Sequence, residues 1–213
     1  EHFQTCVALD FNEKAANTFK QNMPETYVFT GDITNEDTKK EIIAKSKEMG
    51  VNMIIGGPPC QGFALKGKKL GLKDERNYLF REYLRLVEIL KPEVFVIENV
   101  KALLSTASGW FRDEILRYIH SLGYKVNYGV LRALEFGVPQ SRERAIFICS
   151  RSIGVHLPKG DDSHYVTVRD AISDLAYLNS GEGDFEQEYT TEPMSEYQTL
   201  MRNGSRKLYN HKA

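Results

Sequence analysis

The residues best suited to chemistry begin with Cys60, which stands in the turn Gly56-Gly57-Pro58-Pro59-Cys60-Gln61 directly after the apolar run 53–55. The run indicates a short buried strand, and the glycines and prolines predict a sharp turn that presents the thiol at the strand end. A cysteine held there by rigid backbone is a candidate nucleophile. The alternative is a half-buried thiol that only packs in the turn.

Two further segments place charged side chains at strand boundaries. Glu98-Asn99-Val100 follows the apolar run 94–97, and Arg142 and Arg144 precede the apolar run 145–149. At the mouth of an apolar strand, Glu98 is expected to have a raised pKa and to act as an acid. The alternative for Glu98 is a helix-capping or salt-bridged carboxylate.

Asp10 closes the first predicted strand, which spans residues 5–10. In dinucleotide-binding folds a carboxylate at such a strand end accepts hydrogen bonds from both ribose hydroxyls. The alternative is that Asp10 caps the following helix. The strand at 27–29 ends similarly, in Gly31-Asp32.

Composition limits the possible functions. The 213 residues carry 28 basic and 29 acidic side chains, so nucleic-acid binding requires a local patch. Residues 61–73 offer one, with Lys66, Lys68, Lys69 and Lys73 and no acidic residue, although a solvated loop is the alternative. The three cysteines show no zinc-binding spacing and fit a reducing compartment.

No apolar run approaches the roughly 18–20 residues of a membrane span, and no signal peptide is visible. The chain starts without Met and close to a predicted strand, so we expect a missing N-terminal segment. Cys6 and Cys149 lie in apolar runs and are expected to be core residues.

The order of the predicted elements is typical of an α/β fold with a doubly wound, mostly parallel sheet. In the first helix, Ala15, Ala16 and Phe19 are expected to face inward. The predicted strands are 5–10, 27–29, 51–55, 93–97, 124–132 and 145–149, and the predicted helices are 12–22, 36–49, 75–90 and 110–121.

The character of the sequence changes after residue 150. We interpret residues 1–150 as a catalytic domain and 151–213 as a linker or arm that leads toward an absent region. Within the arm, 151–165 is expected to be a loop and 166–178 a short helix, and 179–213 shows little periodicity.

In these segments the chain resembles the cytosine-5 DNA methyltransferase family, over nearly all of its length. Pro58-Pro59-Cys60-Gln61 resembles the family's nucleophile motif, Glu98-Asn99-Val100 its acid motif, and Gln140-x-Arg142-x-Arg144 its arginine motif. Two segments, Ala8-Leu9-Asp10 and Gly31-Asp32-Ile33, resemble the family's cofactor motifs. A third, Arg76-Asn77-Tyr78-Leu79-Phe80, resembles the segment that opens the family's fourth helix.

The chain departs from the family at several points. Asn52 stands where members usually carry Asp, and Ala64 where they often carry Ser. Three parts of the family pattern are absent. They are the first strand with the glycine-rich loop that follows it, the target-recognition region, and the late motifs. The tail from Tyr197 to His211 resembles only the approach to the recognition region.

The resemblance implies an S-adenosylmethionine (AdoMet)-dependent, Rossmann-like methyltransferase fold. Cys60 would add to carbon 6 of cytosine, Glu98 would donate to N3, and Arg144 would hydrogen-bond the base's carbonyl oxygen. Arg142 would bind a phosphate or pair with an acidic neighbour, although the two arginines could have exchanged roles. Asn99 would hold the Pro-Pro-Cys turn.

For AdoMet, Asp10 would accept the ribose hydroxyls, Asp32 and Ile33 would edge the adenine, and Pro58 and Leu79 would line the same cleft. Loop 61–73 would close over a base flipped out of the duplex. The expected contacts to DNA are made by Gln61, Lys66, Lys68, Lys69 and Gln140.

The resemblance thus implies a DNA (cytosine-5-)-methyltransferase of a restriction–modification system. It implies a bacterial, cytoplasmic, nucleoid-associated protein that acts on double-stranded DNA, not on membranes. A cognate restriction endonuclease is the expected partner, and the complete protein is expected to be monomeric, with no metal. The alternatives are an RNA cytosine-5 methyltransferase, a catalytically silent nucleic-acid-binding module, and a different nucleotide-binding enzyme in which Cys60 is structural.

Overall fold

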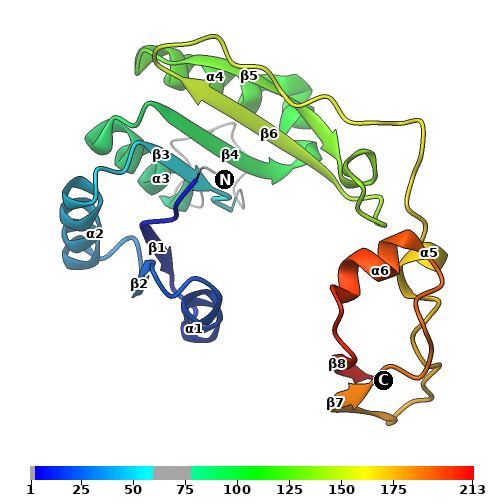
Figure 1. The fold of residues 1–213 in the computed structure, drawn as a ribbon. Coiled ribbons are helices and arrows are strands. Elements are labelled where there is room, and N and C mark those ends of the chain that lie inside the picture. The colour runs from blue at the N-terminus through cyan, green and yellow to red at the C-terminus, as the bar shows by residue number, and fades with distance from the viewer. Residues whose placement is uncertain (1–2, 60–77) are drawn as a thin grey trace. The chain divides into compact units, whose positions relative to one another are not determined.

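The computed structural model describes residues 3–59 and 78–213, which form two compact units (Figure 1). The first unit comprises Glu1–Val130 and Arg144–Pro158, and the second comprises Leu131–Glu143 and Lys159–Ala213. No helix in the described part of the chain is long and apolar enough to cross a membrane.

The strands of the first unit form two sheets. The first sheet pairs β1 (Val7–Asp10) with β2 (Tyr27–Thr30) in parallel. The second has the order β3-β4-β6-β5, with β3 (Met53–Gly56) parallel to β4 (Val94–Val100) and β6 (Glu143–Ser150) antiparallel to β4. β5 (Lys125–Arg132) is the edge strand beside β6, at the end of the sheet opposite β3. The predicted α/β class is confirmed. The pairs β1-β2 and β3-β4 are parallel, whereas β4-β6 is antiparallel, so the four-stranded sheet is mixed.

Four helices connect these strands: α1 (Glu13–Asn22), α2 (Glu36–Glu48), α3 (Tyr78–Leu90) and α4 (Trp110–Ser121). The side chain of Asn12 caps α1 by accepting hydrogen bonds from the backbone N–H groups of residues 14 and 15, and Asn35 caps α2 in the same way. Short 3₁₀ helices follow β4 and β5, at η4 (Lys101–Leu104), η5 (Thr106–Gly109) and η6 (Ala133–Phe136).

The inward stripe predicted for α1 was wrong for two of its three residues. Ala16 is buried, but Ala15 and Phe19 are exposed. The helix covers a sheet of only two strands, so a narrow part of its surface finds a partner.

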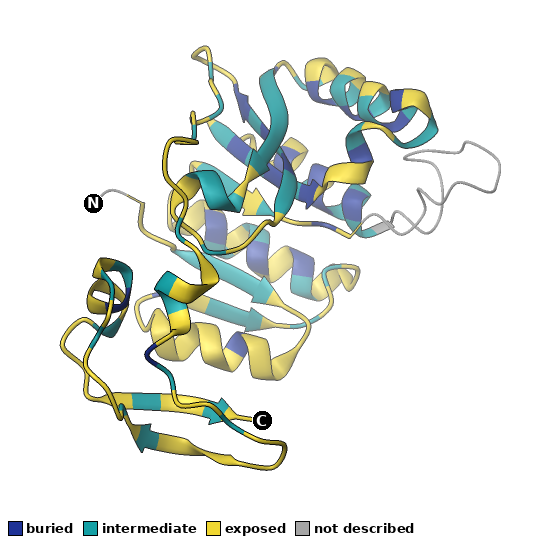
Figure 2. Cartoon of the chain, turned by 90° about the vertical axis from the view of Figure 1, so that its right-hand side faces the viewer, coloured by how far each residue is buried: buried dark blue, intermediate teal, exposed yellow. Residues whose placement is uncertain are grey.

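The hydrophobic core lies where α3 and α4 pack on one face of the four-stranded sheet. Figure 2 shows buried residues concentrated on these elements. Each fully buried Phe, Leu or Ile side chain contributes roughly 1.5–3 kcal/mol to stability. The core residues are Phe80, Tyr83, Leu84, Val87, Phe95, Ile97, Leu103, Phe111, Ile115, Ile119, Tyr124, Ala145, Phe147 and Cys149.

Strand alternation gives the sheet a second face that is only partly covered. In β4, Phe95, Ile97 and Asn99 point into the core, whereas Val96 and Glu98 lie on the other face and are half-buried. The strand also continues through Glu98-Asn99-Val100, three residues further than predicted, because these residues pair with the start of β6.

The second unit contains more regular structure than its sequence predicts. The helix expected at 166–178 is the short α5 (Val168–Ile172). Residues 179–213, which show little periodicity, contain the strand β7 (Gly183–Glu188), then the helix α6 (Glu196–Arg202), then the strand β8 (Lys207–Lys212), which pairs antiparallel with β7. These strands are mostly exposed, so they lack the apolar alternation that identifies strands in a sequence.

The interior of the second unit is polar. Asp174 and Gln198 are its buried polar side chains, and Arg202 Nε donates to Asp174 Oδ2 at 2.9 Å. The Arg202 guanidinium also lies 3.8 Å from the centre of the Tyr189 ring. Ionic and cation–π contacts therefore join α6 to the loops around it.

Candidate active site

Glu98 and Arg144 form the centre of the candidate site. Val100 is opposite Arg144 in the antiparallel β4–β6 register, so Glu98, two residues earlier, lies diagonally across from Arg144 on the same face. Arg144 Nε donates to Glu98 Oε1 at 2.7 Å. Glu98 is thus a salt-bridged carboxylate. Its side chain is 41% exposed, so it is not enclosed by apolar residues.

The turn after β3 is held against this pair. A Cβ atom built on Gly57 would lie 2.9 Å from Glu98 Oε2, so a larger residue there would push the carboxylate out of its observed position. On the opposite face of β4, Asn99 Nδ2 donates to the carbonyl oxygen of Pro58 at 2.9 Å. This is the link between Asn99 and the turn that the sequence predicts. Adjacent residues of β4 thus brace the turn from both faces.

The candidate nucleophile and its loop lie outside the described residues. This applies to Cys60, Gln61, Lys66, Lys68 and Lys69, whose predicted roles therefore stay predictions. Cys149 is buried in the core as predicted, and burial raises the pKa of its thiol, which makes it a poor nucleophile. Cys6 precedes β1 and is half-buried, so its assignment to the core was wrong.

The two carboxylates assigned to the cofactor, Asp10 and Asp32, lie at or just after the ends of the neighbouring strands β1 and β2. Asp10 ends β1, opposite Thr30 of β2, and Asp32 comes two residues after Thr30. Both residues are exposed. Asp10 Oδ1 accepts from the backbone N–H of Asn12 at 2.8 Å, while Asn12 itself caps α1, which excludes the helix-capping alternative for Asp10.

Thr34 orients the second carboxylate. Its backbone N–H donates to Asp32 Oδ1 at 2.8 Å. This hydrogen bond, followed by one from the Thr34 hydroxyl, holds the pKa of Asp32 below its ordinary value. Asp32 is therefore ionised at neutral pH and accepts hydrogen bonds only.

The other predicted cofactor residues differ in accessibility. Ile33 and Leu79 are half-buried, whereas Pro58 is buried and uses its carbonyl oxygen to accept from Asn99.

The two arginines of the arginine motif fall in different units. Arg144 belongs to the first unit, with Glu98, whereas Arg142 and Gln140 belong to the second unit and are exposed. The carbonyl oxygen of Arg142 accepts from the backbone N–H of Ala133.

Sequence reasoning missed Phe11 and Gly57. Phe11 directly follows Asp10 and is 82% exposed, an unusual position for a large apolar ring. The signal was present in the sequence as an aromatic residue next to a strand-end acid. Gly57 gave no such signal, because its role depends on the carboxylate that lies against it.

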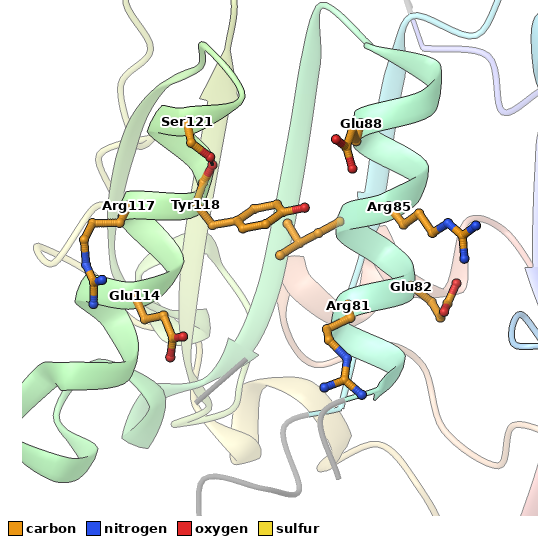
Figure 3. Close-up of a pocket in the computed structure, with 9 residues that line it drawn as sticks. Arg81, Glu82, Arg85, Glu88, Glu114, Arg117, Tyr118 and Ser121 are labelled. Carbon is orange, nitrogen blue, oxygen red and sulfur yellow. Dashed lines mark hydrogen bonds between the residues drawn. The ribbon is translucent and has the colours of Figure 1, made fainter. Parts of the chain in front are cut away.

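A pocket of about 840 Å³ lies between α3 and α4, away from these strand ends (Figure 3). Charged side chains of both helices surround it, and the Tyr118 ring points toward α3. None of the predicted site residues lines it. The lining residues are Arg81, Glu82, Leu84, Arg85, Glu88, Glu114, Arg117, Tyr118 and Ser121.

Comparison with known proteins yields consistent relatives. The chain is 38% identical over 221 residues to the type II methyltransferase M.DdeI of Desulfomicrobium norvegicum, an alignment that covers 99% of this chain and 52% of that protein. It is 37% identical to the type II methyltransferase M1.HphI of Haemophilus parahaemolyticus, over 84% of this chain and 49% of that protein. The chain thus spans about half the length of these relatives.

Solved structures agree on the fold. A protein described as a DNA modification methyltransferase encoded within a prophage (E. coli) superposes with a TM-score of 0.68 and 25% identity, over 91% of this chain and 56% of that one. The Dnmt2 methyltransferase of S. pombe superposes with a TM-score of 0.52 and 18% identity, over 73% of this chain and 44% of that one. At this identity the likeness shows a shared fold alone.

Residues 1–212, nearly the whole chain, match the family described as C-5 cytosine-specific DNA methylase. This chain therefore belongs to the C-5 cytosine-specific DNA methylase family.

Proposed function

We propose that the full-length protein transfers a methyl group from AdoMet to carbon 5 of a cytosine in double-stranded DNA. The observation that carries the proposal is the Glu98–Arg144 pair, which lies against the turn that leads into Cys60. Family membership and relatives named type II methyltransferases support the same activity.

The chemistry uses a nucleophile, an acid and a hydrogen-bond donor. The thiolate of Cys60 adds to carbon 6, and the electron pair of the carbon 5–carbon 6 double bond moves to carbon 5, which becomes nucleophilic. Protonation of N3 by Glu98 and a hydrogen bond from Arg144 to the base's carbonyl oxygen stabilise the charge that develops on the ring. After methyl transfer, loss of the carbon 5 proton and expulsion of the thiolate restore the aromatic ring. The pairing of Glu98 with Arg144 keeps both groups on one face of the sheet before the base arrives.

The strand-end residues fit AdoMet, which supplies the methyl group as an electrophile when bound. The Asp10 carboxylate would accept from the ribose hydroxyls, and the ionised Asp32 would accept from the exocyclic amine of adenine, with Ile33 beside it. The ring of Phe11, which is exposed, would stack on the adenine. Pro58 and Leu79 line the same cleft.

DNA contacts come from both sides of the nucleophile. Lys66, Lys68 and Lys69 bind phosphates, and Gln61 and Gln140 hydrogen-bond near the flipped base. Arg142 binds a phosphate. The arm at 151–213 leads toward the target-recognition region.

The activity belongs to a protein longer than this chain. In the described residues, β1 and β3 are edge strands of two separate sheets in one unit, and we propose that an additional parallel strand between them joins the two sheets. The chain also spans about half the length of its first relatives. The relatives' names favour a restriction–modification system, with a cognate endonuclease as partner, in the bacterial cytoplasm.

The test is methylation by the full-length protein. With AdoMet labelled in its methyl group, we expect label in duplex DNA, recovered as 5-methylcytosine after nuclease digestion, and none in RNA of the same sequence. Label recovered in RNA alone would favour an RNA cytosine-5 methyltransferase. Label in neither nucleic acid, with AdoMet bound, would favour a silent binding module.

A further inference from the structure

Tyr83 of α3 fills the space that a side chain at Gly56 would occupy. A Cβ atom built on Gly56 would lie 2.5 Å from Cε2 and 2.8 Å from Cδ2 of the Tyr83 ring. Gly56 is the last residue of β3, opposite Ile97 of β4, and its missing side chain points toward the core face. The ring therefore touches the backbone of the strand at the point where the turn to Cys60 begins.

The Tyr83 ring is firmly held. Its hydroxyl donates to the carbonyl oxygen of Val96 at 2.8 Å and lies 3.5 Å from that of Ile54, so it contacts β4 and β3 together. The ring also packs edge-to-face on Phe95, with 6.4 Å between centroids. Tyr83 is only 8% exposed. A ring anchored at its hydroxyl and packed on its sides resists displacement.

Three consecutive residues of the turn are thus each fixed by a different side chain. Tyr83 lies beneath Gly56, Glu98 lies against Gly57, and Asn99 bonds the carbonyl oxygen of Pro58. Glu98 and Asn99 belong to the site already described. Tyr83 lies on the core face of the sheet and is not among the residues assigned to substrate or cofactor.

We propose that Tyr83 is a positioning residue: by packing against Gly56, it fixes where the Pro58–Pro59 turn, which leads in sequence directly into Cys60, lies relative to the Glu98–Arg144 pair. The inference rests on the proposed function, because it assigns a purpose to the position of Cys60. It makes Gly56 and Tyr83 a matched pair, in which a larger residue at one position requires a smaller residue at the other.

The matched pair gives a test by rescue. In Gly56→Ala, the new methyl group meets the anchored ring, so the strand end and the turn must shift. Tyr83→Leu removes Cε2, the ring atom nearest to Gly56, together with the hydroxyl that anchors the ring, so the shorter side chain can turn away from that methyl group. Tyr83→Phe keeps the ring atoms and loses only the hydroxyl. Gly56→Ala should therefore be rescued by Tyr83→Leu and not by Tyr83→Phe.

The measurement is made on the full-length protein. The rate at which a duplex containing 5-fluorocytosine forms a denaturation-resistant adduct is followed in a single turnover at saturating AdoMet, at a temperature where circular dichroism shows each variant folded. Gly56→Ala should slow adduct formation by about tenfold or more, a scale expected for a small misplacement of a reacting group. AdoMet affinity should change by less than about twofold. Gly154→Ala is the matched control, because a Cβ atom there meets nothing within 4 Å.

The double variant decides the matter. Gly56→Ala with Tyr83→Leu should form adduct at least about threefold faster than Gly56→Ala alone. A wild-type adduct rate in Gly56→Ala, or equal rates in the Gly56→Ala single variant and its Tyr83→Leu double variant, would overturn the proposal. If Gly56→Ala does not fold, failure of Tyr83→Leu to restore folding would overturn it equally. Absence of any adduct in the wild-type protein would instead reject the proposed function.

Discussion

The Glu98–Arg144 pair places opposite charges 2.7 Å apart on a half-open sheet face before substrate binds. Each side chain satisfies the other while the site is empty of a base, which limits the cost of keeping two charged groups ready. Under the proposed mechanism, a cytosine would exchange this contact for bonds to its own N3 and carbonyl oxygen. The pair is therefore compatible with the acid role proposed for Glu98.

Glu98→Gln tests that role at the residue scale. The amide cannot supply an acidic proton to N3, so we expect the methyl-transfer rate to fall by about 100-fold or more. AdoMet affinity should stay nearly unchanged, because Glu98 is assigned to the base. Rapid-quench kinetics and calorimetry measure the two quantities separately.

Glu48→Gln is the control for Glu98→Gln. Glu48 is an exposed partner of Lys45 on α2, so this exchange removes a carboxylate of the same kind outside the site. Strongly weakened AdoMet binding with normal turnover at saturation would contradict the assignment of Glu98 to N3.

Single residues could be predicted where type and strand-end position together indicate chemistry. Asp10, Glu98 and Arg144 met both conditions, and the structure places Glu98 and Arg144 in contact. The contact itself could not be predicted, because it depends on the antiparallel register of β4 and β6. The same holds for Gly57 and Tyr83, whose roles come from neighbours far away in the sequence.

At the scale of elements, a buried lysine joins α2 to α3. Lys39 Nζ lies 2.6 Å from Glu82 Oε2 of α3 and 2.9 Å from Glu36 Oε1 of its own helix. The Lys39 side chain is almost completely buried. α2 packs near β1, which carries Asp10, whereas α3 packs under β3 and β4. The lysine thus ties the cofactor-side strands to the strands that carry Glu98 and the turn.

Lys39→Ala should be strongly destabilising. It leaves the inward-facing Glu82 carboxylate without its cation, and we expect a loss of about 2 kcal/mol or more in the free energy of unfolding. Lys40→Ala is the matched control, since Lys40 pairs with Asp37 in the same helix but both side chains are exposed, and it should cost less than about 1 kcal/mol. Urea titration of both variants measures the difference. Equal losses would contradict a bridging role for Lys39.

Elements with strong apolar periodicity could be predicted closely. The helix at 110–121 is confirmed to the residue, and Gly123 follows it with φ = 82°. The strands β7 and β8 could not be predicted, because exposed strands pair through their backbones and need no apolar pattern. The exposed side of α1 could not be predicted either, since the width of the sheet beneath it is a property of the fold.

At the scale of the molecule, the first unit contains both sets of strand ends that the proposed function uses. β1 and β2 end in the candidate AdoMet carboxylates, and β3 and β4 end in the turn and the acid. In a doubly wound fold a ligand binds where the strand order reverses, which here is the interval between β1 and β3. A further strand in this interval, as proposed above, would lie beside both the candidate AdoMet carboxylates and the strands that carry the turn and Glu98.

The most direct test of this account is covalent capture of the nucleophile in the full-length protein. A duplex with 5-fluorocytosine at the target site, together with AdoMet, should form an adduct that survives denaturation, because fluorine on carbon 5 cannot leave as a proton does. Peptide mass spectrometry should locate the base on Cys60. Cys6→Ala should form the adduct normally, whereas Cys60→Ala should form none. An adduct on another residue, or an undiminished yield from Cys60→Ala, would contradict the assignment of Cys60 as the nucleophile.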